Sequence, residues 1–123
     1  IIPDYGAEAF RYYFLRHVPT QDDGDFTWEK FEAAYNGELG NDLGNLVQRV
    51  AKMVQSYQAG VIGDAPQSEH DMGPYRQAME SYMFDQAMDE IWLIVRSLNQ
   101  YIERVQPCKL LKIVIKIQKQ SHI

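Results

Sequence analysis

The stretch YNGELGNDLGNLVQRVAKMV, residues 35–54, decides the fold because its apolar side chains recur at steps of three and four. The stripe comprises Leu39, Leu43, Leu46, Val47, Val50 and Val54, and it continues to Tyr57. An α-helix turns by about 100° per residue, so these positions share one face of a long amphipathic helix. Asn45 and Arg49 lie one turn apart on the opposite side. Taken alone, the pattern indicates a solvated face for this polar pair.

A second stripe of the same kind lies in residues 85–105. It comprises Ala87, Ile91, Ile94, Val95, Leu98, Tyr101, Ile102 and Val105. Gln106-Pro107 is expected to end this helix, since a residue before proline resists helical geometry. We expect the two long helices to share a core, with Asn45 and Arg49 exposed and facing the turn at Pro107. The predicted core residues are Leu43, Val50, Val54, Ile91, Ile94 and Leu98.

Shorter helices are predicted around these two, over residues 3–17, 27–35 and 74–82. Loops rich in Pro, Gly and Asp separate them at 17–25 and 59–74, and Thr27 is expected to be an N-cap. Asn36-Gly37 either breaks or bends the chain between two helices. Lysines at 109, 112, 116 and 119 allow a short amphipathic helix after Pro107, which the β-branched run 113–115 disfavours. With no strand alternation, the fold class is all-α, an antiparallel helix bundle.

Composition narrows the possible partners. The chain has 123 residues, enough for one domain, and a net charge of −5. All 17 acidic residues lie between Asp4 and Glu103, whereas residues 109–123 hold four lysines and no acid. This balance argues against generic phosphate binding and against DNA, so a nucleic-acid partner requires a local patch. One cysteine, Cys108, excludes an internal disulfide and fits a cytoplasmic protein, and no apolar run is long enough to predict a membrane partner.

Catalytic and metal-binding patterns are absent from the sequence. The three histidines are scattered, Cys108 has no CxxC partner, and neither a phosphate-binding glycine loop nor an HExxH motif occurs. We therefore predict no catalytic residue and no metal site. The residues alone leave two interpretations open, a solvated helical domain and a helical protein-interaction module.

Two segments carry a family resemblance. The first is YGAEAFRYYFLRHVPTQDDGDFTWEKFEAAYNGELGNDLGNLVQR, residues 5–49, and the second is NQYIERVQPCKL, residues 99–110. In these two segments the chain resembles methionyl-tRNA synthetases, just after their catalytic core. The resemblance implies three parts. Residues 1–26 are the last helix and loop of the connecting region, 27–110 form a helical anticodon-binding domain of the class I aminoacyl-tRNA synthetase type, and 111–123 match nothing in the family.

The resemblance also implies a function. The family joins methionine to its tRNA using ATP, and its HIGH-type and KMSKS-type motifs belong to an upstream domain and do not occur here. This chain alone is thus expected to be inactive and to hold no cofactor, with ATP bound by the catalytic domain of the same polypeptide. The aromatic first helix is expected to pack on that domain and to leave an apolar patch here that favours self-association. Its aromatic residues are Phe10, Tyr12, Tyr13 and Phe14.

The family pattern assigns a binding site. It implies that Asn45 and Arg49 point toward the CAU anticodon of methionine tRNA, beside a Pro-Trp turn whose ring stacks on the first anticodon base. That turn is Pro107-Cys108 here, so the largest stacking surface is lost. Base–aromatic stacking contributes about 1–3 kcal/mol to the free energy of binding. Three explanations of this change are open: a neighbouring aromatic residue compensates for the lost ring, anticodon reading is relaxed, or the C-terminal sequence has diverged. The alternative function is a helical protein-interaction module that has lost anticodon specificity.

Overall fold

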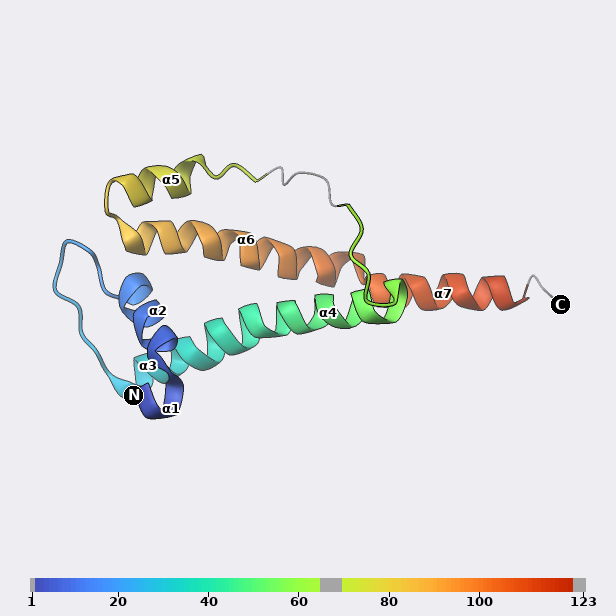
Figure 1. Cartoon of the computed structure of the whole chain (residues 1–123), viewed down its shortest axis with the longest axis horizontal. Coiled ribbons are helices and arrows are strands. Elements are labelled where there is room, and N and C mark those ends of the chain that lie inside the picture. The colour runs from blue at the N-terminus through green and yellow to red at the C-terminus, as the bar shows by residue number, and fades with distance from the viewer. Residues whose placement is uncertain (1, 65–69, 121–123) are drawn as a thin grey trace.

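The computed structural model describes residues 2–64 and 70–120, and these residues form helices and connecting loops without any strand (Figure 1). The elements are α1 (Ile2–Tyr5), α2 (Ala7–His17), α3 (Trp28–Ala34), η1 (Tyr35–Gly44), α4 (Asn45–Gln58), α5 (Gly73–Glu80), α6 (Phe84–Val105) and α7 (Pro107–Gln120). The all-α prediction is confirmed. No helix in the described ranges is both long and apolar enough to cross a membrane.

The elements α3, η1 and α4 follow one another as a single long helical rod. Thr27 caps its start as predicted, because its Oγ1 accepts a hydrogen bond from Lys30 N at 3.2 Å. Asn36-Gly37 does not break the rod, which instead continues as the π-helical segment η1. Gly44 ends that segment, and a Cβ on it would lie 3.0 Å from the carbonyl oxygen of Leu39. A glycine is therefore favoured where the wider π turn returns to α-helix.

The two long helices α4 and α6 lie side by side and run in the same direction (Figure 1). The chain is reversed between them by α5, which packs antiparallel against α6 as the predicted bundle requires. The α4–α6 pair thus differs from an antiparallel pair. The reason is the extra helix between them, which returns the chain before α6 begins.

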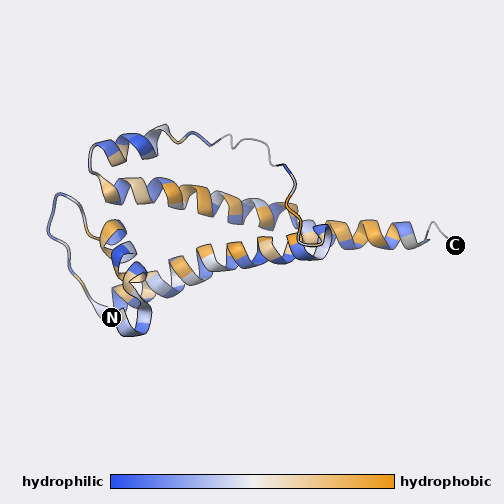
Figure 2. Cartoon of the chain, in the orientation of Figure 1, coloured by the Kyte–Doolittle hydropathy of each residue, from blue (hydrophilic) through white to orange (hydrophobic). Residues whose placement is uncertain are grey.

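The core consists of two small clusters. One joins α2 to α3 through Ala9, Tyr13, Phe31 and Ala34, and the other joins α4 to α6 through Leu46, Trp92 and Val95. Hydrophobic residues recur along α4 and α6 and continue along α7 (Figure 2). Each cluster is built from residues of different helices, and the second one joins the beginning of α4 to the middle of α6.

The predicted shared core is only partly correct. Leu43 and Ile91 pack against the second cluster, but Val50 is 42% exposed and Leu98 is 40% exposed. Val54 and Ile94 are half-buried. The apolar stripe specifies which face of a helix turns inward, whereas burial also requires a covering element. Among the described elements, the main contacts of α4 are with η1 and α6, and the apolar face of its distal half is left partly open.

The aromatic residues of α2 are covered only in part by this chain itself, and the expected self-association stays a prediction. Tyr13 is 2% exposed, and Tyr12 lies against Trp92 with ring centroids 5.3 Å apart. Phe14 remains 38% exposed and stacks on Phe26 at 6.1 Å. The loop after α2 returns the chain so that Phe26 and α3 lie against it. This fold-back buries Tyr13 and covers part of Tyr12, whereas Phe14 and Leu15 stay exposed and keep part of the expected apolar patch.

The helix after Pro107 is longer than expected. It is α7, and it extends away from the bundle beyond the ends of α4 and α6 (Figure 1). Gln106 separates it from α6 by adopting the left-handed conformation, with φ 45° and ψ 55°. Pro107 then starts the new helix, where the missing N–H costs nothing.

Candidate nucleic-acid interface

A groove of about 300 Å³ lies where α4, α6 and α7 meet. Its lining residues are Arg49, Lys52, Met53, Ser56, Tyr57, Ile102, Cys108 and Lys112. We call it the junction groove. Two residues of the predicted site, Arg49 and Cys108, are brought together here although they are far apart in the sequence.

The other two predicted residues lie next to the groove. Asn45 is exposed on α4, one turn before the half-buried Arg49, and is not among the lining residues. Pro107 is half-buried and precedes Cys108 at the start of α7. The predicted exposure is therefore confirmed for Asn45, whereas Arg49 is more covered than expected because it lies at the wall of the groove. The role of all four in binding stays a prediction.

The turn at Gln106 places the thiol of Cys108. Gln106 N donates to the carbonyl oxygen of Ile102 at 2.9 Å, which closes α6, and Lys109 N donates to the carbonyl oxygen of Gln106 at 2.9 Å, which opens α7. Because the chain changes direction within one residue, the first turn of α7 lies against the last turns of α4. Cys108 is exposed at this point.

Tyr57 is the aromatic residue of the junction groove. Its side chain is 38% exposed, and a hydrogen bond with Cys108 raises the pKa of its hydroxyl group. Sequence reasoning assigned Tyr57 to the apolar stripe of its helix and missed this role. A signal existed, because position 57 follows Arg49 by eight residues, about two helical turns.

The charged side chains that line the junction groove are all positive. Arg49, Lys52 and Lys112 lie around it, and none of the described residues that line it is acidic. Met53 and Ile102 supply an apolar floor beside the ring of Tyr57. Cations around an exposed aromatic ring suit a ligand that is flat and apolar in one part and anionic in another.

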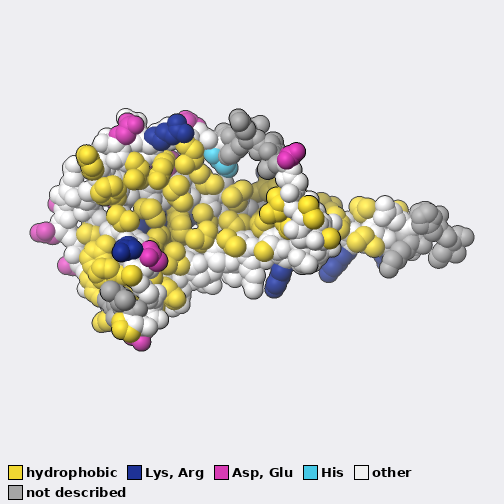
Figure 3. Space-filling view, viewed as in Figure 1, with side chains coloured by type: hydrophobic (Ala, Val, Ile, Leu, Met, Phe, Trp, Pro, Cys, Tyr) yellow, Lys and Arg dark blue, Asp and Glu magenta, His cyan; other side chains and the backbone are white. Residues whose placement is uncertain are grey.

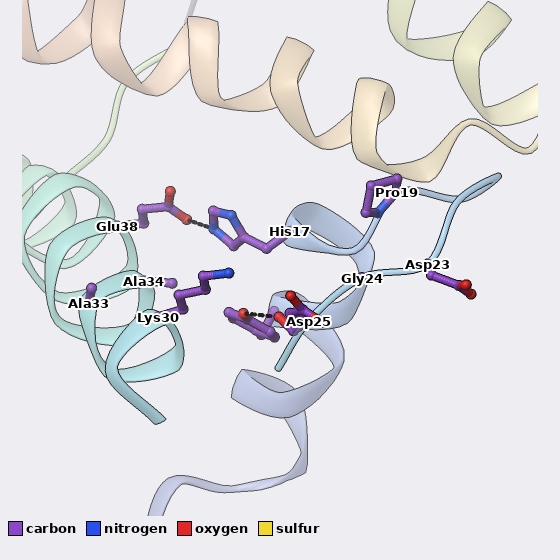
Figure 4. A pocket seen from close by; sticks show the side chains of 10 residues that line it. His17, Pro19, Asp23, Gly24, Asp25, Lys30, Ala33, Ala34 and Glu38 are labelled. Carbon is purple, nitrogen blue, oxygen red and sulfur yellow. Dashed lines mark hydrogen bonds and ion pairs between the residues drawn. The ribbon is translucent and has the colours of Figure 1, made fainter. Parts of the chain in front are cut away.

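A larger cavity of about 600 Å³ lies at the other end of the bundle, between α2, the loop after it and α3 (Figure 4). His17 and Glu38 face each other there, with Nε2 and Oε2 2.9 Å apart. The hydroxyl of Tyr13 donates to the backbone oxygen of Asp25 at 3.4 Å. These contacts leave no nucleophile poised beside a base, so the cavity offers no catalytic constellation.

Glu38, which lines that cavity, is the centre of an ion-pair network. It accepts a hydrogen bond from the hydroxyl of Tyr12 and one from Nε of Arg16 at 3.1 Å. Burial alone raises the pKa of Glu38, but the hydrogen bonds from Tyr12 and His17 and the nearby positive charges outweigh it and lower the pKa. Burial and the bond to Glu38 raise the pKa of Tyr12.

Arg16 extends this network to α6. Its side chain is 6% exposed, its Nη1 lies 2.8 Å from Oδ1 of Asp89, and its Cζ lies 5.3 Å from the ring centroid of Trp92. The network therefore joins α2, η1 and α6. Its role is structural, since it sets how α4, which continues from η1, lies against α6.

Asn99 is a further positioning residue that sequence reasoning did not single out. Its Nδ2 donates to the backbone oxygen of Asp42 in η1 at 3.0 Å. A side-chain amide thereby satisfies a carbonyl of the π-helical segment and ties η1 to the distal half of α6. The only signal in the sequence is that Asn99 opens the second family-like segment.

The comparisons with known proteins agree with one another. The family described as tRNA synthetases class I (M) matches residues 1–51. Methionine–tRNA ligase of Enterococcus faecalis is 36% identical over 91% of this chain and 18% of its own length. Methionine–tRNA ligase 1 of Bacillus cereus is 39% identical over 91% of this chain, and the Streptomyces coelicolor ligase 38% over 88%.

The chain spans about a fifth of the length of these curated relatives, with coverage from 18% to 22%. The match includes both long helices and the turn that forms the junction groove. The helical fold agrees with a domain of a tRNA synthetase. This chain belongs to the methionine–tRNA ligases, a family of class I aminoacyl-tRNA synthetases.

Proposed function

We propose that this chain is the anticodon-binding domain of a methionine–tRNA ligase and that the junction groove, with Asn45 beside it, receives the anticodon loop of methionine tRNA. The observation that carries the proposal is the meeting of Arg49, Tyr57 and Cys108 in one cation-lined groove. The catalytic domain of the same polypeptide then binds ATP and attaches methionine to the tRNA in the cytoplasm.

The chemistry of Asn45 and Arg49 suits a loop nucleotide. A base that leaves its stack exposes its Watson–Crick edge, and an amide offers this edge both a donor and an acceptor. Arg49 adds a permanent charge, five donors and a flat face. Their spacing of four residues directs both groups toward the same place on α4.

Tyr57 takes the place of the aromatic ring that Cys108 lacks. Its exposed ring lies next to Cys108, within the groove that also contains Arg49. Base–aromatic stacking tolerates any base because every base has a flat face, and the ring of Tyr57 offers an aromatic surface for it. The position of Tyr57 supports the explanation that a neighbouring aromatic compensates for the lost ring.

A second candidate function has one specific observation in its favour. An open apolar groove of about 560 Å³ runs along the distal halves of α4 and α6, lined in part by Val50, Val54, Leu98 and Ile102. Such a surface suits a protein partner that lays an apolar face into it. This docking function predicts no dependence of RNA affinity on Asn45 or Arg49.

Titration of RNA stem-loops tests the proposal. The chain is titrated against a labelled stem-loop with the anticodon CAU and against one with a changed first anticodon base. We expect the CAU loop to bind more tightly, Asn45→Ala to remove most of this discrimination, and Arg49→Ala to weaken binding to both loops. Asn41→Ala is the matched control, since Asn41 is also exposed and lies one turn earlier. Equal binding of both loops by the unmodified chain contradicts the proposal.

A further inference from the structure

We infer that the lysine face of α7 binds the phosphate backbone of the same RNA and extends the junction groove into a longer cationic strip. The inference rests on the proposed function and adds to it a binding surface in the segment that the family-like motifs do not cover. We define the cationic strip as Arg49 and Lys52 on α4 with Lys112 and Lys116 on α7.

The geometry of α7 gathers its lysines. At about 100° per residue, Lys109, Lys112 and Lys116 lie within about 60° of one another around the helix. Lys112 lines the junction groove together with Arg49 and Lys52. Lys116 follows one turn later, about 6 Å farther along the axis. The strip therefore begins at the proposed anticodon site and leads away from it along α7.

The surface shows the same arrangement. Lys and Arg side chains lie along one edge of the molecule where α4 ends and α7 begins, without acidic side chains on that edge (Figure 3). In the described part of the chain, Lys109, Lys112 and Lys116 form no ion pair. The last acidic residue of the sequence is Glu103. The positive charge of α7 is thus available to an external anion.

The difference in charge between the cationic strip and the rest of the chain favours an anionic partner. The protein as a whole is acidic, with a net charge of −5, so a polyanion is repelled from most of its surface and attracted at this strip. Continuity with the groove favours the backbone of the RNA already bound there. Phosphates recur along that backbone, which a row of lysines at helical spacing can follow. An anionic membrane is the competing partner, because the opposite side of α7 exposes Leu110 and Val114.

The test compares two variants of equal charge change. Lys112→Gln with Lys116→Gln removes two cations from the strip, and Arg11→Gln with Arg76→Gln removes two exposed cations on α2 and α5. Each chain is titrated with the CAU stem-loop and with the changed loop at 50 and 200 mM salt. Circular dichroism confirms that the helices are retained.

Loss of two phosphate contacts lowers the slope of log affinity against log salt by about 1.4. Between 50 and 200 mM salt, the unmodified chain is then expected to lose about sevenfold more affinity than the strip variant. Because phosphates carry no base identity, the change is the same for both loops. The Arg11 and Arg76 control keeps the original slope.

An unchanged slope in the strip variant overturns the inference, as does a slope that falls equally in the control. Loss of binding to anionic phosphatidylglycerol vesicles without any change for RNA also overturns it and assigns the strip to a membrane. If both loops bind equally while the strip variant lowers the slope, the strip binds RNA and the anticodon assignment alone fails. The two proposals are therefore separable.

Discussion

Replacement of Arg16 by methionine is the most informative test of how this bundle is held together. The substitution keeps an unbranched apolar side chain of similar length and removes the guanidinium. Arg16 is the link between α2, η1 and α6, because it contacts Glu38, Asp89 and the ring of Trp92. Its loss leaves the carboxylate of Glu38, which is 18% exposed, with fewer compensating partners.

The expected magnitude follows from these contacts. A charge-assisted hydrogen bond to a buried group contributes about 1.5–3 kcal/mol, and a desolvated cation over an aromatic ring about 2 kcal/mol. The pair with Asp89 adds little, because that carboxylate is 68% exposed and screened by water. Tyr12 and His17 still hold Glu38. We therefore expect the free energy of unfolding to fall by about 3 kcal/mol, at the lower end for a broken buried ion pair.

Urea denaturation followed by circular dichroism measures this loss. For a slope of about 1.5 kcal/mol per molar urea, the midpoint moves down by about 2 M. Glu38→Gln and the double variant complete a thermodynamic cycle, in which we expect the double variant to lose less than the sum of the two single losses. A midpoint within a few tenths of molar of the unmodified chain, or strictly additive losses, would refute the structural role of the network.

The same network predicts a pH dependence. The pKa of Glu38 is lowered in the folded chain relative to its ordinary value of 4.5, so its ionised form is the stabilising one. This contribution is complete above that ordinary value and is lost as the pH falls through the lower folded pKa. Unfolding measured between pH 6 and pH 3 should therefore show a flatter decline of stability in Glu38→Gln than in the unmodified chain.

Three further substitutions and one activity measurement test the junction, the contact between α6 and η1, and the absence of catalysis. Cys108→Trp should tighten binding to the CAU stem-loop by about tenfold or more in fluorescence anisotropy, and unchanged affinity in a folded variant would exclude this turn from the site. Gln106→Gly should raise stability by about 0.5–1 kcal/mol, because glycine adopts the left-handed conformation without a Cβ penalty, and a lower melting temperature would contradict this reason. Asn99→Leu should cost about 1–3 kcal/mol in urea unfolding by leaving the carbonyl of Asp42 without its donor. The chain alone should give no methionine-dependent ATP–pyrophosphate exchange, and measurable exchange would place catalysis in these residues.

Local features of the sequence determined the helices. Thr27 predicts its own cap because a hydroxyl one residue before a helix can accept from the third backbone N–H of that helix, and Lys30 N does donate to it. Pro107 likewise predicts the end of α6, since its ring excludes helical geometry at the preceding residue. Such rules act over a few residues, so they hold before any tertiary contact is made. The family-like segments also pointed to Asn45, Arg49 and the turn at 107–108.

Only the tertiary structure decided which of these residues meet and which apolar faces are covered. In the sequence, Tyr57 is one more apolar position of its helix. Its contact with Cys108 depends on the turn at the left-handed residue Gln106. Val50 and Leu98 had the same periodicity as the buried Leu46, yet they lie on an open groove because the described helices provide no cover there. Periodicity fixes an angle around one helix axis. Burial, ion pairing and the shape of a site depend on the distances between helices, which are set by contacts such as that of Arg16 with Glu38 and Asp89, between residues far apart in the chain.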